Sequence, residues 1–399
     1  SLKVVFVVGQ CLGLYPVTGF LEKDVRKMRF SFFTWKFLYS LLICCFQIMT
    51  AVICFYRLII NSMHLSTVVF MCFYASTCVT SILYITVAAR WSGLMLQLTH
   101  SRLDEYTDTR IKRKCTIISL GYLALCIVLQ IFRAIGKLQE VMNCSATGKD
   151  MLKTYIEVTT PWIFELNIPY NRFTLILLAV LNIVTLMIFF FSDLFLACVS
   201  LFLASILRKL NEKVTSSHGK ILPSTYWRHL REDYNRITTV IRSFDDVIGC
   251  LIFSSFAFSL FFICLQLYYI LSKGANTYFT AINGPCPNVS GGLFNGYEHV
   301  VYIISLITFL VLRFLFVTLC IAEINSASHT IAPSLYKIPS SVFCKEVQRF
   351  VDQIHGQIIA LSGLKYFFVT RELIFSIIST IITYELVLFQ FNSDPLKLF

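Results

Sequence analysis

The sequence predicts an all-α membrane protein with seven transmembrane helices. Apolar residues make up 57% of the 399 residues and charged residues only 14%, and the mean hydropathy is +0.73. Soluble domains carry about a quarter charged residues, so this composition excludes a soluble enzyme of the same length. In addition, seven apolar runs are each long enough to cross a hydrocarbon core of about 30 Å as a helix.

These apolar runs follow one another along the whole chain. They cover residues 37–60, 65–89, 115–135, 173–203, 247–271, 299–322 and 369–391. Each contains few charges, which is typical of membrane-spanning helices. An odd number of spans places the two termini on opposite sides of the membrane.

The basic residues between the runs give the orientation. Of the 34 Lys and Arg residues, 25 lie on the side of the amino terminus and 8 on the other side, with Arg313 inside the sixth run. Loops rich in Lys and Arg stay in the cytoplasm. We therefore expect a cytoplasmic amino terminus without a cleaved signal peptide, and an extracellular carboxyl terminus.

Two glycosylation motifs agree with this orientation. Asn143-Cys144-Ser145 and Asn288-Val289-Ser290 both fall in loops assigned to the exterior. Cys144 and Cys286 lie in the same loops, and either a disulfide between them or two unpaired thiols fits the sequence.

The segments on the cytoplasmic side are predicted to be helical. In 341–361 apolar residues recur at intervals of three and four, which indicates an amphipathic helix leading directly into the last span. Residues 226–244 show a similar pattern. We therefore expect a cytoplasmic segment (1–36), six spans with an extracellular-side ligand pocket (37–323), an anchor region (324–368), a seventh span (369–391) and a short tail (392–399).

The seventh run carries a polar stripe. Thr380, Thr383 or Tyr384, Val387, and Gln390 or Phe391 recur at three and four, so they share one helix face. A polar stripe on a membrane helix normally faces protein or water, which indicates a pore or a packed seam. Glu385 lies about 100° away from Tyr384 around the helix, so we expect it to contact a neighbouring helix.

The end of this run also carries a recognisable motif. Thr383-Tyr384, five residues, and Gln390-Phe391 resemble the TY-x5-QF signature of insect gustatory receptors, and the stretches around it and at 227–234 are most similar to the sugar-receptor clade. The resemblance implies a ligand-gated, non-selective cation channel in the plasma membrane of chemosensory neurons. It implies a homotetramer, or a heteromer with related subunits, whose pore is formed by the last helix. A bitter or odorant ligand remains an alternative to a sugar.

Polar and aromatic residues gather at the predicted outer ends of the spans. Aromatic rings stack on the C–H faces of sugars, while carboxylate, amide and imidazole groups bond their hydroxyls. An interfacial aromatic belt would also concentrate Tyr and Trp at this depth, and the resemblance favours a pocket. The predicted ligand-binding residues, called the outer cluster below, are Gln130, Arg133, Trp162, Glu165, Gln266, Tyr269, Tyr297, Glu298, His299 and Tyr302.

Two charged residues, Asp193 and Arg313, fall inside apolar runs. An unpaired charge there costs at least about 3 kcal/mol, so both should face the interior of the bundle. A structural polar tether is the favoured interpretation over a ligand role.

Other functions find no support in the sequence. The seven histidines are scattered without an HExxH motif, and no Gly-rich phosphate loop is present, so we expect no enzyme, metal or cofactor. The basic residues alternate with apolar runs, which favours contact with the lipid bilayer over nucleic acid. A G-protein-coupled heptahelical receptor would need an extracellular amino terminus, and a transporter would need Gly- or Pro-broken helix pairs.

The orientation is directly testable. Epitope tags at the two termini should label on opposite sides of intact cells, because the charge asymmetry places only the carboxyl terminus outside. Asn143 and Asn288 should carry glycans, and a tag inserted within 341–361 should be reached only after permeabilisation. Labelling of both termini from outside would contradict the predicted topology.

Overall fold

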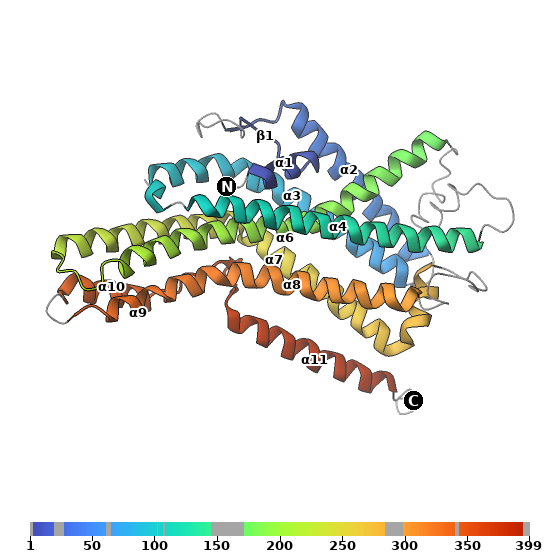
Figure 1. The fold of residues 1–399 in the computed structure, drawn as a ribbon. Helices are drawn as coiled ribbons and strands as arrows, with labels where there is room; N and C mark the ends of the chain where they lie inside the picture. Colours follow the sequence, from blue (N-terminus) through green and yellow to red (C-terminus); the bar gives the residue numbers. More distant parts are fainter. Residues whose placement is uncertain are drawn as a thin grey trace.

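Long helices lying side by side make up most of the molecule (Figure 1). The computed structural model describes residues 3–19, 28–60, 65–101, 103–106, 108–144, 171–283, 298–339 and 343–393. The long helices are α2 (Trp35–Ile60), α3 (Leu65–His100), α4 (Thr109–Cys144), α6 (Arg172–Thr215), α7 (Ser224–Asn283), α8 (Glu298–His329) and α11 (Arg371–Ser393). The shorter elements are α1 (Lys3–Cys11), the 3-10 helix η2 (Leu103–Tyr106), α9 (Ile331–Tyr336) and α10 (Lys345–His355).

Six helices of the described part are long and apolar enough to cross a membrane: α2, α3, α4, α6, α7 and α8. They contain the first six predicted runs, which confirms an all-helical, multi-pass architecture. The seventh run corresponds to α11, which is not among the six, so its passage through the membrane stays a prediction.

The helices continue well beyond the apolar runs. α6 extends to Thr215 and α7 already begins at Ser224, which confirms the helix predicted at 226–244. Trp227, Tyr234 and Phe244 of this extension are fully buried, and the Tyr234 ring packs on Phe350 of α10. The extensions therefore form a second packed region with α9 and α10 at one end of the bundle (Figure 1).

The predicted helix at 341–361 is shorter than expected. α10 covers Lys345–His355 and buries Val347, Phe350, Val351 and Ile354, whereas Phe343 and Ile358 are exposed. The last helical hydrogen bond runs from Gly356 N to Asp352 O, and the helix stops at this glycine, which is a poor helix former. The direct continuation into the last span was also wrong, since a hairpin lies between α10 and α11.

This hairpin pairs β3 (Ser362–Gly363) with β4 (Phe367–Phe368). Leu364 and Lys365 at its tip both have positive φ, 52° and 64°, and Tyr366 N donates to Gly363 O over 3.0 Å. These are the features of a type I′ turn, which normally uses Asn and Gly. Non-glycine residues in the left-handed region are strained, so the surrounding contacts must hold the turn.

Two neighbouring aspartates of α7 provide those contacts. Asp245 accepts hydrogen bonds from Ser362 N (2.6 Å) and Ser362 Oγ (2.8 Å) in a buried position. Asp246 pairs with Lys365 over 2.9 Å at the surface, and this hydrogen bond raises the pKa of Lys365. The hairpin is thereby fixed to α7 immediately before α11 begins.

The amino-terminal segment contains a helix that the sequence analysis missed. Val5 and Phe6 of α1 are buried, and Phe6 packs edge-on against Trp91 of α3. A Cβ at Gly9 would lie 2.8 Å from the ring of Phe191 in α6, so glycine permits this close approach. The segment before α2, which also pairs the short strands β1 (Val17–Thr18) and β2 (Arg29–Phe30), is therefore part of the bundle.

The two charges predicted to face the interior do so, and they bind each other. Arg313 of α8 forms an ion pair with Asp193 of α6, and both side chains are at most 3% exposed. Asp193 also accepts hydrogen bonds from Ser255 of α7 (3.0 Å) and Tyr122 of α4 (3.4 Å). The polar tether thus joins four helices inside the bundle.

The hairpin contacts predict unequal effects of two adjacent substitutions. Asp245→Ala should lower the midpoint of thermal unfolding, because it leaves the buried N–H and hydroxyl of Ser362 unpaired at a cost of about 1–3 kcal/mol. Asp246→Ala, the matched control, removes a solvent-exposed pair and should change the midpoint little. Thermal denaturation of the purified variants in detergent measures both, and equal midpoints would contradict the role of Asp245.

Candidate functional site

The helix α11 has two different faces. Ile374, Ile377, Ile381 and Glu385 recur at three and four and turn toward the body of the bundle, where α11 packs on α7 and α8. On other sides of the helix Thr380, Thr383, Tyr384, Val387 and Gln390 are exposed in the single chain. The residues of the predicted polar stripe therefore point away from the chain's own core, except that the Phe391 side chain lies outside the described residues.

The hydroxyl groups on this exposed face are satisfied within α11. Thr380 Oγ1 donates to Ser376 O over 2.8 Å, and Thr383 Oγ1 donates to Ser379 O over 2.9 Å. Their oxygens still have lone pairs that can accept hydrogen bonds from water. Such a face is compatible both with a water-filled path and with packing against another helix.

Glu385 lies on the other face. It is 6% exposed on the side of α11 that packs on α7 and α8, and neither carboxylate oxygen has a hydrogen-bond partner in the described part of the chain. This placement agrees with the expectation that Glu385 contacts a neighbouring helix rather than the stripe.

The first residue of α11 is joined to two other helices by charge. Arg371 Nη2 lies 2.9 Å from Glu323 Oε2 of α8, and the other carboxylate oxygen of Glu323 lies 2.6 Å from Arg208 Nη2 of α6. One carboxylate therefore bridges two guanidinium groups. Together with the hairpin on α7, this bridge connects the base of α11 to α6, α7 and α8.

The structure leaves most of the outer cluster untested. Trp162, Glu165 and Tyr297 lie outside the described residues, and so does Asn288 with Cys286. Five other members lie in described helices, but nothing is described of their side chains: Arg133, Tyr269, Glu298, His299 and Tyr302. The same holds for Asn143 and Cys144.

Two members of the outer cluster are described in full. Gln130 is half-buried in α4, and Gln266 is 7% exposed in α7. The carboxyl-terminal halves of α4 and α7 and the start of α8 lie toward the same end of the bundle (Figure 1). The backbone therefore brings the helical members of the cluster toward one end, while their contacts remain a prediction.

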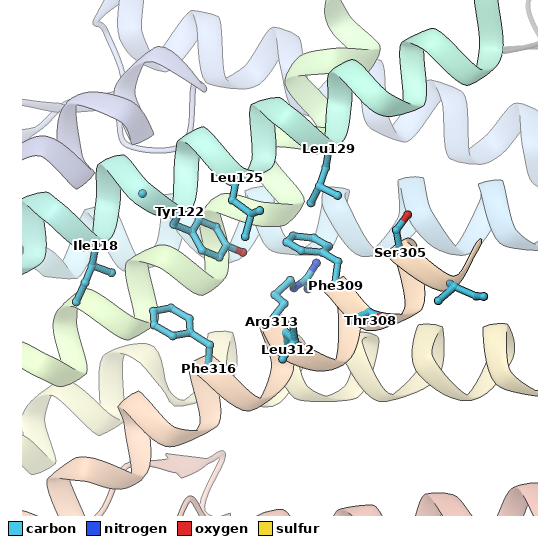
Figure 2. A pocket seen from close by; sticks show the side chains of 12 residues that line it. Ile118, Tyr122, Leu125, Leu129, Ser305, Thr308, Phe309, Leu312, Arg313 and Phe316 are labelled. Carbon is cyan, nitrogen blue, oxygen red and sulfur yellow. The ribbon is translucent and has the colours of Figure 1, made fainter. Parts of the chain in front are cut away.

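A groove that the sequence analysis did not predict lies between α4 and α8. This α4–α8 groove has a volume of about 750 Å³ and is lined mainly by apolar side chains. From α4 come Ile118, Gly121, Tyr122, Leu125 and Leu129, and from α8 come Ile304, Ser305, Thr308, Phe309, Leu312, Arg313 and Phe316 (Figure 2).

The ion pair closes the inner side of the groove. The guanidinium of Arg313 lies 4.0 Å from the ring centre of Phe189, and Arg313 Nη2 donates to Ser259 Oγ over 3.2 Å. Its charge is thus balanced by Asp193 and covered by an aromatic face. A sugar needs many hydrogen bonds, so this nearly apolar groove is a poor match for a sugar and a better match for a hydrocarbon.

The described residues offer no metal site, because they contain no group of three His, Cys, Asp or Glu side chains able to hold an ion. No signal in the sequence revealed the groove, because its walls come from helices far apart in the chain.

Comparisons with known proteins identify relatives of this chain in sequence and in fold. A family model described as trehalose receptor matches residues 1–282 and 293–397. Gustatory receptor 5a for trehalose of Drosophila melanogaster is 27% identical over 400 residues, covering 99% of this chain and 85% of the relative. Gustatory receptor for sugar taste 64f of the same species is 26% identical, covering 98% and 80%.

A solved structure shows the same fold. The insect olfactory receptor OR5 from Machilis hrabei superposes with a TM-score of 0.67 over 97% of both chains at 14% identity. The similarity of fold extends along nearly the whole chain, and the family match covers almost every residue. The chain belongs to the trehalose receptor family of insect gustatory receptors.

Proposed function

We propose that this gustatory receptor is a sugar-gated, non-selective cation channel whose pore is lined by α11. The observation that carries the proposal is the division of α11 into a face packed on its own chain and an exposed face with two threonines, a tyrosine and a glutamine. A helix of this kind is completed by other copies of itself or by water.

The proposed assembly is a homotetramer, or a heteromer with related subunits, in the plasma membrane of chemosensory neurons. Four copies of α11 around one axis would turn the exposed positions into rings. Val387 and Phe391 would form apolar constrictions that close by dewetting, and Gln390 would offer amides in place of part of a cation's hydration shell. Such a lining passes cations without strong selectivity among them.

The family match supports a sugar as the ligand. Two relatives that match over most of their length are named for trehalose and for sugar taste. The outer cluster contains the carboxylate, imidazole and aromatic groups that sugar recognition requires, and its helical members lie on α4, α7 and α8. We therefore propose that the extracellular sugar binds there.

The base of α11 supplies the proposed connection between ligand and pore. A sugar that moves α8 would also move Glu323, and the bridge from Glu323 to Arg371 would carry this displacement to the first turn of α11. The hairpin on α7 would act as the second attachment. Gating would then be a change in the position of α11 relative to the other helices of the same chain.

Single cysteines from Thr380 to Phe391, probed with a water-soluble thiol reagent in current recordings, test the pore. Block should recur every three to four residues at Thr380, Thr383 or Tyr384, Val387, and Gln390 or Phe391, with sugar changing access below the constriction. Ile374→Cys and Ile377→Cys on the packed face, together with the unmodified chain, are the controls. Uniform insensitivity along α11 would remove it as the conduction path.

Alanine at Glu165, Glu298 and His299, tested singly and together against a panel of sugars, examines the ligand site. Each loss of a hydrogen-bonding partner should raise the half-maximal sugar concentration about 5- to 150-fold, since it costs about 1–3 kcal/mol. Alanine at Glu105 and His229, which are exposed, and at Glu232, which is half-buried, is the matched control, because these residues lie in η2 and α7 and outside the outer cluster. An unchanged sugar response of the triple variant would place the pocket elsewhere, and activation by apolar odorants or bitter compounds alone would favour another ligand class.

A further inference from the structure

We propose that the α4–α8 groove is a binding site for an anionic glycerophospholipid, with one acyl chain between the two helices and the phosphate at the basic start of α4. This site is separate from the outer cluster and from the exposed face of α11. It rests on the shape of the groove, its lining and the charges at one end.

The groove has the dimensions of one acyl chain. Its lining on α4 runs from Ile118 to Leu129, about 16 Å at the helical rise of about 1.5 Å per residue. This is close to half of a hydrocarbon core about 30 Å thick, which is the depth of one leaflet. A chain lying along α4 would therefore start near Ile118 and end near Leu129.

The groove is open to the side where lipid would stand. Leu125, Ile304 and Leu312 line it and are still 49%, 59% and 59% exposed. In the most apolar 18-residue stretch of α4 only 17% is buried inside the chain, which is the smallest share among the six candidate spans. In Figure 2 the lining side chains of α4 and α8 project into the space between the two helices. A lipid chain can therefore enter from the bilayer without unfolding either helix.

The charge on the inner side of the groove is neutralised, so it does not exclude an acyl chain. Arg313 reaches it, but the ion pair with Asp193 balances its charge, and the ring of Phe189 covers the guanidinium. Gly121 adds space, because a Cβ at this position would meet no atom within 4 Å. The groove is thus apolar where the chain would lie and wide where glycine replaces a side chain.

Charge selects the headgroup. Lys114 lies four residues before Ile118 and so one turn below it on the same side of α4. Arg110, Lys112, Arg113 and Lys114 are all exposed, and the structure shows no ion pair between them and any described acidic side chain. Arg110 and Lys114, one helical turn apart on the groove side of α4, fit an anionic headgroup better than a zwitterionic one. The predicted orientation places this end in the cytoplasmic leaflet, where anionic lipids are concentrated.

The test uses the full chain in phosphatidylcholine vesicles that contain a small fraction of phosphatidylserine with a photoreactive acyl chain. Labelled peptides should come from 118–129 and 304–316. Unlabelled phosphatidylserine should compete at least about fivefold better than phosphatidylcholine, the factor expected from a single basic residue near an anionic lipid. This competition needs no variant, so it stands even if a variant fails to fold.

Two pairs of variants locate the two parts of the lipid. Gly121→Leu should reduce labelling by filling the groove, whereas Gly93→Leu, at another exposed helical glycine with nothing within 4 Å, should not. Replacing Arg110 and Lys114 by Gln should weaken labelling, whereas the same change at the exposed Arg228 and Lys337 should not, although the net charge falls equally.

Three results would overturn the proposal. Equal competition by both unlabelled lipids would exclude selection of an anionic headgroup. Labelling spread evenly over the exposed faces of α2 and α4, and unaffected by Gly121→Leu, would exclude a site in the groove. Cross-linking of α4 to a second copy of the chain would show that protein, not lipid, covers the groove.

Discussion

The ion pair between Asp193 and Arg313 fixes the arrangement of the long helices. Either charge alone in a hydrocarbon environment would cost several kcal/mol, so α6 and α8 are stable only in the register that brings the two together. Ser255 and Tyr122 extend the requirement to α7 and α4, because their hydroxyls complete the carboxylate's hydrogen bonds. One polar cluster thereby helps to specify the relative position of four helices.

The opposite end of the bundle is organised by different forces. There the extensions of α6 and α7 pack with α9 and α10 around Trp227, Tyr234 and Phe350, as in a soluble helical domain. This packed region holds the hairpin through Asp245 and the start of α11 through Glu323. α11 is therefore joined to this packed region at its first residue and packs on the rest of the chain along one face. Because α11 is attached at its base and packed along only one face, it is suited to the change of position that the proposed gating requires.

The sequence predicted the features that depend only on the bilayer, because the bilayer imposes the same constraints on every apolar run. The thickness of the bilayer sets the length of an apolar run, so the first six spans were correct, and a charge in such a run must find a partner, so Asp193 and Arg313 were expected inside. Features that depend on a particular contact were missed. α1 has only nine residues and owes its position to the close approach of Gly9 to Phe191. Leu364 and Lys365 are not typical of a type I′ turn, so the hairpin between α10 and α11 carries no sequence signal. The outer cluster draws on loops as well as helices, and it stays a prediction together with the oligomeric state and the orientation.

The buried carboxylate of Glu385 has a consequence for how the protein is made. A helix is released from the translocon into lipid according to its own apolarity, and a charged residue near its middle opposes this by about 2.5–3.5 kcal/mol. On the proposed topology α11 emerges after α7 and α8, and the Glu385 side chain is buried on the face of α11 that packs on these two helices. Its insertion therefore depends on a completed bundle rather than on its own hydropathy. On the proposed topology biogenesis of this receptor is ordered, since the proposed pore helix α11 would enter the membrane only after α7 and α8 are in place.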